Sequence, residues 1–303
     1  MTGKISVLAD ISSRGGKVPP LYLYPVYILP GLIYSVESTG KFLYVPFLLL
    51  SVAILPLMAA TNLFDDYFDF KNGVDLKDSP NTIYRRHPIF HFNVTPGYLI
   101  LWATILSVIY IIFIIILSLF YGIAVLIIGL TGWGLGYGYT GWPLSYKYRG
   151  LGELGVFLSS ILANMIIIAA TVRSFRFGEV LFILPFSILM TLVLFVGNYR
   201  DRNYDRASGL RTIVVRLGEG GSKIFVSCIF IVFYALDIFY SFISIYPLIS
   251  LVTLVTSPIA YNASNSWYQI DPKNFESYIG RNISIILGVL LLLLTVNILI
   301  QKI

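Results

Sequence analysis

Residues 97–117 read GYLILWATILSVIYIIFIIIL, a run of 21 residues without one charged side chain. A transmembrane α-helix needs about 20 consecutive apolar residues to cross about 30 Å of hydrocarbon, and this run meets that length. A strand of a membrane barrel would alternate apolar and polar residues instead. The run therefore predicts a membrane-spanning α-helix.

The composition of the whole chain agrees with a membrane protein. Of its 303 residues 57% are hydrophobic and only 12% are charged, whereas a soluble globular domain carries about 25% charged residues. So few polar residues cannot cover a water-soluble core. The net charge of +6 is better explained by orientation in a membrane than by nucleic acid, so we expect no nucleic-acid partner.

Nine apolar segments are long enough to cross the hydrocarbon. We expect an all-α polytopic membrane protein, with residues 1–303 forming a single domain of nine transmembrane helices. The spans are expected near residues 19–37, 43–64, 97–117, 119–139, 151–172, 178–199, 221–242, 244–265 and 282–301.

The distribution of positive charge supports this count. With nine spans, 17 of the 21 Lys and Arg residues fall on the N-terminal side of the membrane. Cytoplasmic loops carry an excess of Lys and Arg, and a miscounted helix would have mixed the two sides. We therefore expect an integral cell-membrane protein with a cytoplasmic N-terminus. No feature of the sequence points to an obligate protein partner.

Two acidic clusters follow the second and sixth predicted spans, on the side expected to be cytoplasmic. Each combines an Asn with Asp residues at offsets of 3, 4 or 7, which places them on one helical face. The first cluster is Asn62, Asp65, Asp66 and Asp69, and the second is Asn198, Asp201 and Asp205. Because both lie on the same side of the membrane, they could face one cavity.

Carboxylates this close together repel one another, and near a low-dielectric region they stay ionised only beside cations. Oxygen ligands select hard metals, so Mg²⁺ held by one or two carboxylates from each helix, with a bridging diphosphate, is the natural choice. The alternative for each cluster is a solvated helix end whose carboxylates pair with neighbouring Lys or Arg residues. Basic residues on the same side that could hold phosphate oxygens include Lys147, Arg200 and Arg211.

The motifs around these clusters resemble those of a known family. NLFDDYFDFKNGVD at 62–75 and NYRDRNYDRASGLRTIVVRLG at 198–218 resemble the two aspartate-rich motifs of the UbiA superfamily of intramembrane prenyltransferases. YTGWPLSYKYRGLGELGVFL at 139–158 is most similar to the menaquinone-pathway branch. The resemblance implies a nine-helix UbiA-like bundle acting as a single transmembrane prenyltransferase domain.

The resemblance also implies a reaction, the Mg²⁺-dependent transfer of a prenyl chain from an allylic prenyl diphosphate to an aromatic acceptor. In the menaquinone branch that acceptor is dihydroxynaphthoate. The implied metal ligands are Asp66, Asp69, Asp201 and Asp205, with Asn62 and Asn198 as catalytic contacts to the metal or the phosphate. The implied substrate-binding residues are Asp65, Lys147, Arg200 and Arg211, with Tyr139, Tyr146 and Tyr199 as aromatic walls for the allylic cation.

Other functions remain open at this stage. Geranylgeranyl transfer to geranylgeranylglyceryl phosphate, in archaeal lipid synthesis, would use the same diphosphate-binding parts, and a phosphatidyl-type transferase would also fit the metal. A cation transporter is the alternative of another class, although transport sites usually lie near the bilayer midplane and these carboxylates lie at span ends. His87 and His91 flank a loop segment that could cover the site or simply lie at the interface.

Overall fold

Among the described residues the helices begin at Tyr24 and end at Ile300. The structure, a computed structural model, describes residues 24–84, 86–173, 176–270 and 272–301. Within these ranges every regular element is a helix and no strand is present, so the predicted all-α fold is confirmed. The N-terminal cations counted above and the start of the first predicted span lie outside the described residues.

Six helices are long: α3 (Tyr44–Lys71), α6 (Pro96–Tyr121), α8 (Gly152–Val172), α9 (Phe177–Ala207), α10 (Ile213–Phe242) and α12 (Pro272–Ile300). The shorter α-helices are α2 (Leu29–Thr39), α4 (Pro80–Tyr84), α5 (Pro88–Phe92), α7 (Ile123–Gly138) and α11 (Ser257–Asn265). Four 3₁₀ helices complete the fold: η1 (Tyr24–Tyr27), η2 (Tyr146–Arg149), η3 (Leu248–Thr256) and η4 (Ser266–Tyr268).

Six helices of the described chain are long and apolar enough to cross a membrane, which makes this an integral membrane protein. They match six of the nine predicted spans. The other three predicted spans fall on shorter elements, namely α2 with η1, the 16-residue α7, and the pair η3 and α11. The count of nine spans is therefore not confirmed. The predicted break at residue 118 lies instead at Gly122, whose φ of 102° is accessible to glycine.

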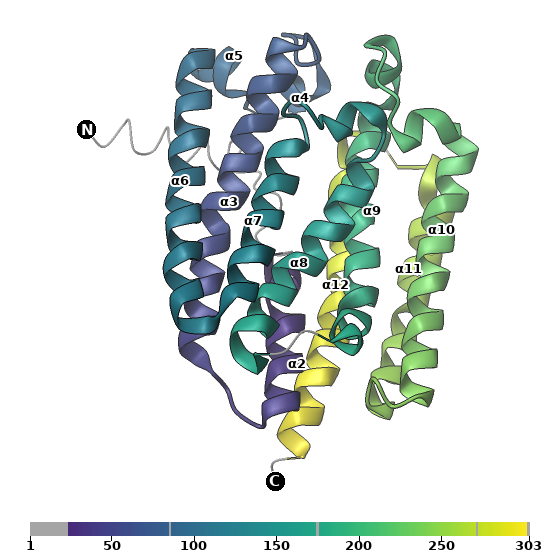
Figure 1. Cartoon of the computed structure of the whole chain (residues 1–303). Helices are drawn as coiled ribbons and strands as arrows, with labels where there is room; N and C mark the ends of the chain where they lie inside the picture. Colours follow the sequence, from purple (N-terminus) through teal and green to yellow (C-terminus); the bar gives the residue numbers. More distant parts are fainter. Residues whose placement is uncertain (1–23, 85, 174–175, 271, 302–303) are drawn as a thin grey trace.

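Helix boundaries differ from the predicted ones where the acidic clusters lie. α3 continues to Lys71 and α9 to Ala207, beyond the expected ends at 64 and 199. Both acidic clusters are thus held on regular helix, and their residues keep the common face that the spacing predicts. The ends of α3 and α9 lie at the same end of the bundle as α4 and α5, at the top of Figure 1.

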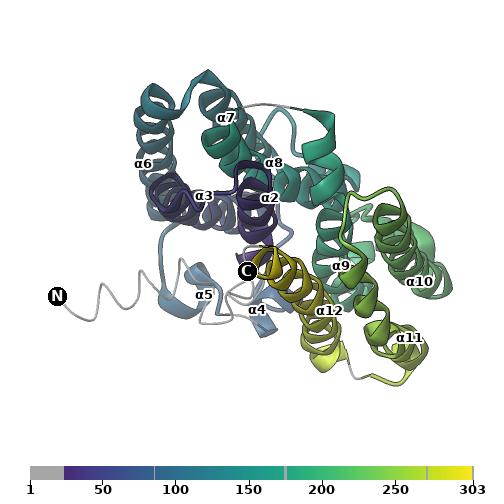
Figure 2. The same cartoon turned by 90° about the horizontal axis from the view of Figure 1, so that it is seen from below.

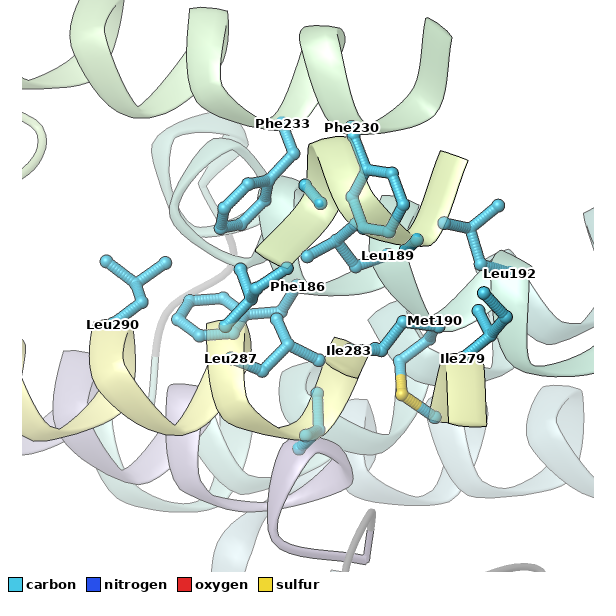
Figure 3. Close-up of a cluster of buried hydrophobic side chains, with 14 of the residues drawn as sticks. Phe186, Leu189, Met190, Leu192, Phe230, Phe233, Ile279, Ile283, Leu287 and Leu290 are labelled. Carbon is cyan, nitrogen blue, oxygen red and sulfur yellow. The ribbon is translucent and has the colours of Figure 1, made fainter. Parts of the chain in front are cut away.

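α9 joins two groups of packed helices. It packs against α8, which leads to α7, α6, α3 and α2, and against α10 and α12 on its other side (Figures 1 and 2). Figure 3 shows Phe186, Leu189 and Met190 of α9 among side chains of α10 and α12, and all of these side chains are buried. Burying a large apolar side chain contributes about 1.5–3 kcal/mol, so this packing holds α9, and with it the second acidic cluster, in place.

Candidate active site

Lys147 connects the segment between α7 and α8 to the first acidic cluster. Its Nζ donates to Asp65 Oδ1 at 2.7 Å and also to Asp69 Oδ2, and its side chain is 16% exposed. Burial alone would lower the pKa of Lys147, but the Asp65 and Asp69 carboxylates raise it well above its ordinary value. Lys147 is therefore a permanent positive charge between two buried carboxylates.

The turn that carries Lys147 is fixed by its backbone. The Lys147 N–H donates to the Tyr139 carbonyl at 2.9 Å, and Gly150 ends the turn with a φ of 76°. A Cβ on Gly150 would lie 2.3 Å from the Arg211 carbonyl oxygen. Only glycine permits both this conformation and this contact, so the segment before α8 packs directly on the link between α9 and α10.

Tyrosines surround Lys147. The Tyr148 hydroxyl donates to Asp69 Oδ1 at 2.8 Å, and Lys147 Nζ lies 5.4 Å from the centre of the Tyr139 ring. Tyr139 and Tyr146 meet edge to face with ring centres 5.5 Å apart. Burial raises the pKa of Tyr146 to about 12, so this phenol stays neutral. Two of the three predicted wall residues, Tyr139 and Tyr146, thus lie beside the first cluster.

Asp66, Asp75 and His87 form a second group beside Lys147. Among the described residues they are the one set of three His, Cys, Asp or Glu side chains whose ligand atoms lie within 4.8 Å of one another, and all are buried. His87 Nδ1 accepts the Ile89 backbone N–H at 3.3 Å, which leaves Nε2, 3.3 Å from Asp75 Oδ2, to carry the proton. Burial would raise the pKa of Asp75, but the hydrogen bond from His87 and the charge of Lys147 bring it below its ordinary value. Asp75 is thus a further anionic residue of the site.

In the second cluster Arg200 holds Asp201. Arg200 Nε and Nη2 donate to the two Asp201 carboxylate oxygens at 2.5 and 2.7 Å, and Nη1 donates to Glu276 of α12. The Arg200 side chain is only 5% exposed, against 20% for Asp201. Its guanidinium also lies over the Tyr84 ring of α4, 5.4 Å from the ring centre. Arg200 therefore ties α9 to both α12 and the segment after α3.

Asp205 relates the two clusters to each other. Its side chain is buried, and the charges that act on it come from Asp201 and Arg200 of its own helix and from Lys147 and Asp75, which lie beside the first cluster. Lys147, which pairs with Asp65 and Asp69, thus lies within electrostatic range of Asp205. That the two clusters face one cavity stays a prediction.

Not every predicted site residue joins this group. Asn62 is half-buried on α3 beside the aspartates, and Asn198 donates its amide N–H to Glu153 Oε1 at 3.0 Å. The Tyr199 ring packs on Trp267 and Phe275, with ring centres 4.4 and 4.9 Å apart. The Arg211 side chain is exposed. The structure brings together Asp65, Asp66, Asp69, Asp201, Asp205, Lys147, Arg200, Tyr139 and Tyr146.

Sequence reasoning gave no role to several residues of the site. Tyr148 and Glu153 lie inside the 139–158 motif, and Asp75 ends the first motif, so motif membership was the available signal. His87 was considered only as part of a loop. Glu276 had no local signal, because its partner Arg200 lies 76 positions away.

The long apolar helices make the chain a membrane protein. At one end of the bundle, aspartates lie close to one lysine and one arginine, and such a site is suited to binding cations and phosphate. A family model described as the UbiA prenyltransferase family matches residues 23–286. The chain belongs to this family. The family predicted from the two acidic motifs is confirmed.

Among curated proteins the chain is similar to the 1,4-dihydroxy-2-naphthoate octaprenyltransferase of Bacillus subtilis (strain 168). The two are 28% identical over 204 residues, which is 62% of this chain and 60% of that protein. The match thus spans about three fifths of the relative's length.

Solved structures show the same fold. A UbiA homologue from Aeropyrum pernix K1 has a TM-score of 0.68 at 15% identity, over 92% of this chain and 98% of that one. A digeranylgeranylglyceryl phosphate synthase has a TM-score of 0.62 at 18% identity, over 91% and 97% of the two chains. A homologue from Archaeoglobus fulgidus bound to DMAPP and Mg²⁺ has a TM-score of 0.56 at 12% identity, over 91% and 99%.

Proposed function

We propose that the chain transfers a prenyl group from an allylic prenyl diphosphate to an aromatic acceptor, with Mg²⁺ as the metal. The observation that carries this proposal is the pairing of Lys147 with Asp65 and Asp69 within electrostatic range of Arg200, Asp201 and Asp205. A diphosphate can replace the carboxylates as partner of both cations, and the carboxylates are then available to a divalent cation. The A. fulgidus homologue, bound to DMAPP and Mg²⁺, supports both ligands.

The donor set fits Mg²⁺, because carboxylate oxygens are hard ligands and Asp66 and Asp75 already place oxygen atoms within 4.8 Å of each other. Mg²⁺ would neutralise negative charge on the departing diphosphate. The residues that would hold it are Asp66, Asp69, Asp201 and Asp205, with Asp75 as an addition from the structure.

The other side chains of the site would bind the diphosphate and stabilise the allylic cation. Lys147 and Arg200 would donate to the diphosphate oxygens as the carbon–oxygen bond of the donor breaks and its electron pair leaves with the diphosphate. The faces of Tyr139 and Tyr146, beside Lys147, would stabilise the allylic cation without bonding to it. A ring carbon of the acceptor would then form the new carbon–carbon bond and lose the group it carried, either its proton or, at the carboxylate-bearing carbon of dihydroxynaphthoate, carbon dioxide, so that the ring becomes aromatic again.

Dihydroxynaphthoate is the acceptor that we propose, because the B. subtilis relative is named for it. We also propose the nine-helix arrangement, with the N-terminus and the site on the cytoplasmic side, because 17 of the 21 cations fall on that side when nine spans are counted. The structural similarity to a digeranylgeranylglyceryl phosphate synthase makes geranylgeranylglyceryl phosphate the second candidate acceptor.

The test is product mass. The purified protein in lipid receives Mg²⁺, geranylgeranyl diphosphate and either dihydroxynaphthoate or geranylgeranylglyceryl phosphate. A prenylated naphthalene that disappears in Asp66→Ala and Asp201→Ala but not in the exposed Asp78→Ala is the expected result. A digeranylgeranyl product with the same dependence would move the chain to lipid synthesis, and no aspartate-dependent product would contradict the proposed function.

Removing His87 should weaken the response to Mg²⁺. His87 Nε2 lies 3.3 Å from Asp75 Oδ2, and loss of a residue that orients a metal ligand typically lowers metal affinity by about 10- to 100-fold. We expect His87→Ala to raise the half-saturating Mg²⁺ concentration by about 10-fold while the rate at saturating Mg²⁺ changes less. His91→Ala is the control for a local change of structure, because His91 is exposed on the helix that His87 caps and its Nδ1 accepts the His87 backbone N–H at 3.1 Å. Equal Mg²⁺ curves for both variants would show that His87 does not act on the metal site.

A further inference from the structure

Glu153 lies in the first turn of α8 and is only 3% exposed. Its Oε1 accepts the Asn198 amide N–H at 3.0 Å. Its Oε2 is buried and has no hydrogen-bond partner among the described residues, and no Lys or Arg of the described chain lies within 4.0 Å of the carboxylate. One oxygen of this buried carboxylate is therefore satisfied and the other is not.

The surroundings of Glu153 place it beside the first acidic cluster. A Cβ on the preceding Gly152 would lie 3.6 Å from the Tyr139 hydroxyl, and one on Gly155 would lie 2.4 Å from the Tyr146 ring. The charge of Glu153 acts on Tyr139, as do the charges of Lys147, Asp65 and Asp69. The same tyrosine pair that flanks Lys147 thus also flanks Glu153.

The depth of Glu153 in the bundle is given by its partner. Asn198 precedes Asp201 by three residues on α9, so the Glu153–Asn198 pair lies nearly one helical turn further into the bundle than the second cluster. A donor whose diphosphate lies between the clusters presents its reacting carbon towards this depth. An acceptor must meet the donor there.

A structural role accounts for only part of this arrangement. A carboxylate in the first turn of a helix is favoured by the helix dipole, and Oε1 could serve only to hold Asn198. Neither accounts for Oε2, because buried polar atoms in folded proteins are nearly always hydrogen-bonded. The missing donor must then come from outside the described chain, and a water or a substrate can supply it.

We propose that Glu153 binds the acceptor substrate, with Oε2 accepting a hydrogen bond from a ring hydroxyl and Asn198 holding the carboxylate in position. This proposal rests on the proposed function and extends it to the choice of acceptor. As the ring carbon bonds to the allylic carbon and the diphosphate leaves with the electron pair of the broken bond, positive charge grows on that hydroxyl. The hydrogen bond between this hydroxyl and the Glu153 carboxylate is therefore stronger in the transition state than in the ground state. This charge disappears when the ring carbon loses its proton or, at the carboxylate-bearing carbon of dihydroxynaphthoate, carbon dioxide.

The test is a kinetic comparison of wild type and Glu153→Gln at saturating prenyl diphosphate and Mg²⁺. Gln can still accept from Asn198 through its oxygen, but it then presents an N–H where Oε2 stood. We expect the acceptor KM to rise by about 10-fold or more and kcat to fall, because the hydroxyl loses its acceptor. The KM for prenyl diphosphate and the thermal midpoint should stay unchanged.

A second acceptor separates this role from a structural one. The methyl ether of the acceptor hydroxyl cannot donate to Glu153, so wild type should use it poorly and Glu153→Gln should use it no worse than wild type does. Equal losses for the hydroxyl and methyl ether acceptors, or an equal rise in both substrate KM values, would overturn the proposal.

Failure of the proposed function would be visible separately, as the absence of prenylated aromatic product from wild type. In that case equilibrium dialysis of dihydroxynaphthoate against wild type and Glu153→Gln, with prenyl diphosphate and Mg²⁺ present, decides the proposal. Binding that weakens about 10-fold in the variant would support it. Equal binding, or no binding to either protein, would overturn it.

Discussion

Lys147→Met is expected to lower the rate of prenyl transfer by about 10²- to 10³-fold and to destabilise the fold by about 3–5 kcal/mol. The rate falls because the variant loses a charged donor to the departing diphosphate. The stability falls because Asp65 and Asp69, both buried, lose the ammonium group between them. Initial rates at saturating substrates and the midpoint of thermal unfolding in detergent measure the two effects.

A triple variant separates these two effects. Combining Lys147→Met with Asp65→Asn and Asp69→Asn removes the unpaired buried charges, so the midpoint should return most of the way to that of wild type. Prenyl transfer should stay at or below the level of Lys147→Met, because no cation replaces Lys147 and Asp69, a predicted metal ligand, is lost as well. Full activity in Lys147→Met would show that the ammonium group serves only the fold.

Spacing predicted the local geometry of the site well. Offsets of 3, 4 and 7 from Asn62 or Asn198 indicate one helical face, and α3 and α9 both continue far enough to hold these faces. The same rule would have excluded Tyr199. One position after Asn198, it is rotated by about 100° from the acidic face, and its ring indeed packs on Trp267 in the core.

The sequence could not predict which residues form ion pairs between segments that are distant along the chain. Lys147 meets Asp65 across 82 positions and Arg200 meets Glu276 across 76, and no local pattern states which carboxylate each cation will contact. The sequence therefore indicated Lys147 and Arg200 as phosphate contacts, whereas in the structure each of them binds carboxylates. A bound diphosphate would replace these carboxylates as the partner of both cations.

Three spans were predicted as single helices and are short or broken. Apolar composition reports how much of a segment can lie in hydrocarbon, but it does not report where the backbone departs from α-helix. Gly122 separates α6 from α7, and the 3₁₀ helix η3 precedes α11 where an unbroken span was expected near 244–265. These breaks depend on packing between helices.

Asp205→Asn is also expected to lower the rate of prenyl transfer strongly, but unlike Lys147→Met it should not destabilise the fold. Prenyl transfer should fall at least about 100-fold, because a predicted metal ligand is lost. The Asp205 side chain is buried, and burying a carboxylate without a hydrogen-bond partner costs free energy. Among the described residues Asp205 has no hydrogen bond or ion pair to lose. Asparagine should therefore leave the thermal midpoint unchanged or raise it, as expected where a residue serves function at the expense of stability.

Asp201→Asn is the matched control, because the substitution is the same and the position lies about one turn away on the same helix. Both oxygens of Asp201 accept from Arg200, which is 5% exposed, so this variant leaves a buried guanidinium with fewer partners and should lower the midpoint. Both variants should lose activity, but only Asp201→Asn should lower the thermal midpoint. If Asp205→Asn were as destabilising as Asp201→Asn, Asp205 would be a structural residue, and the two clusters would not share a metal through it.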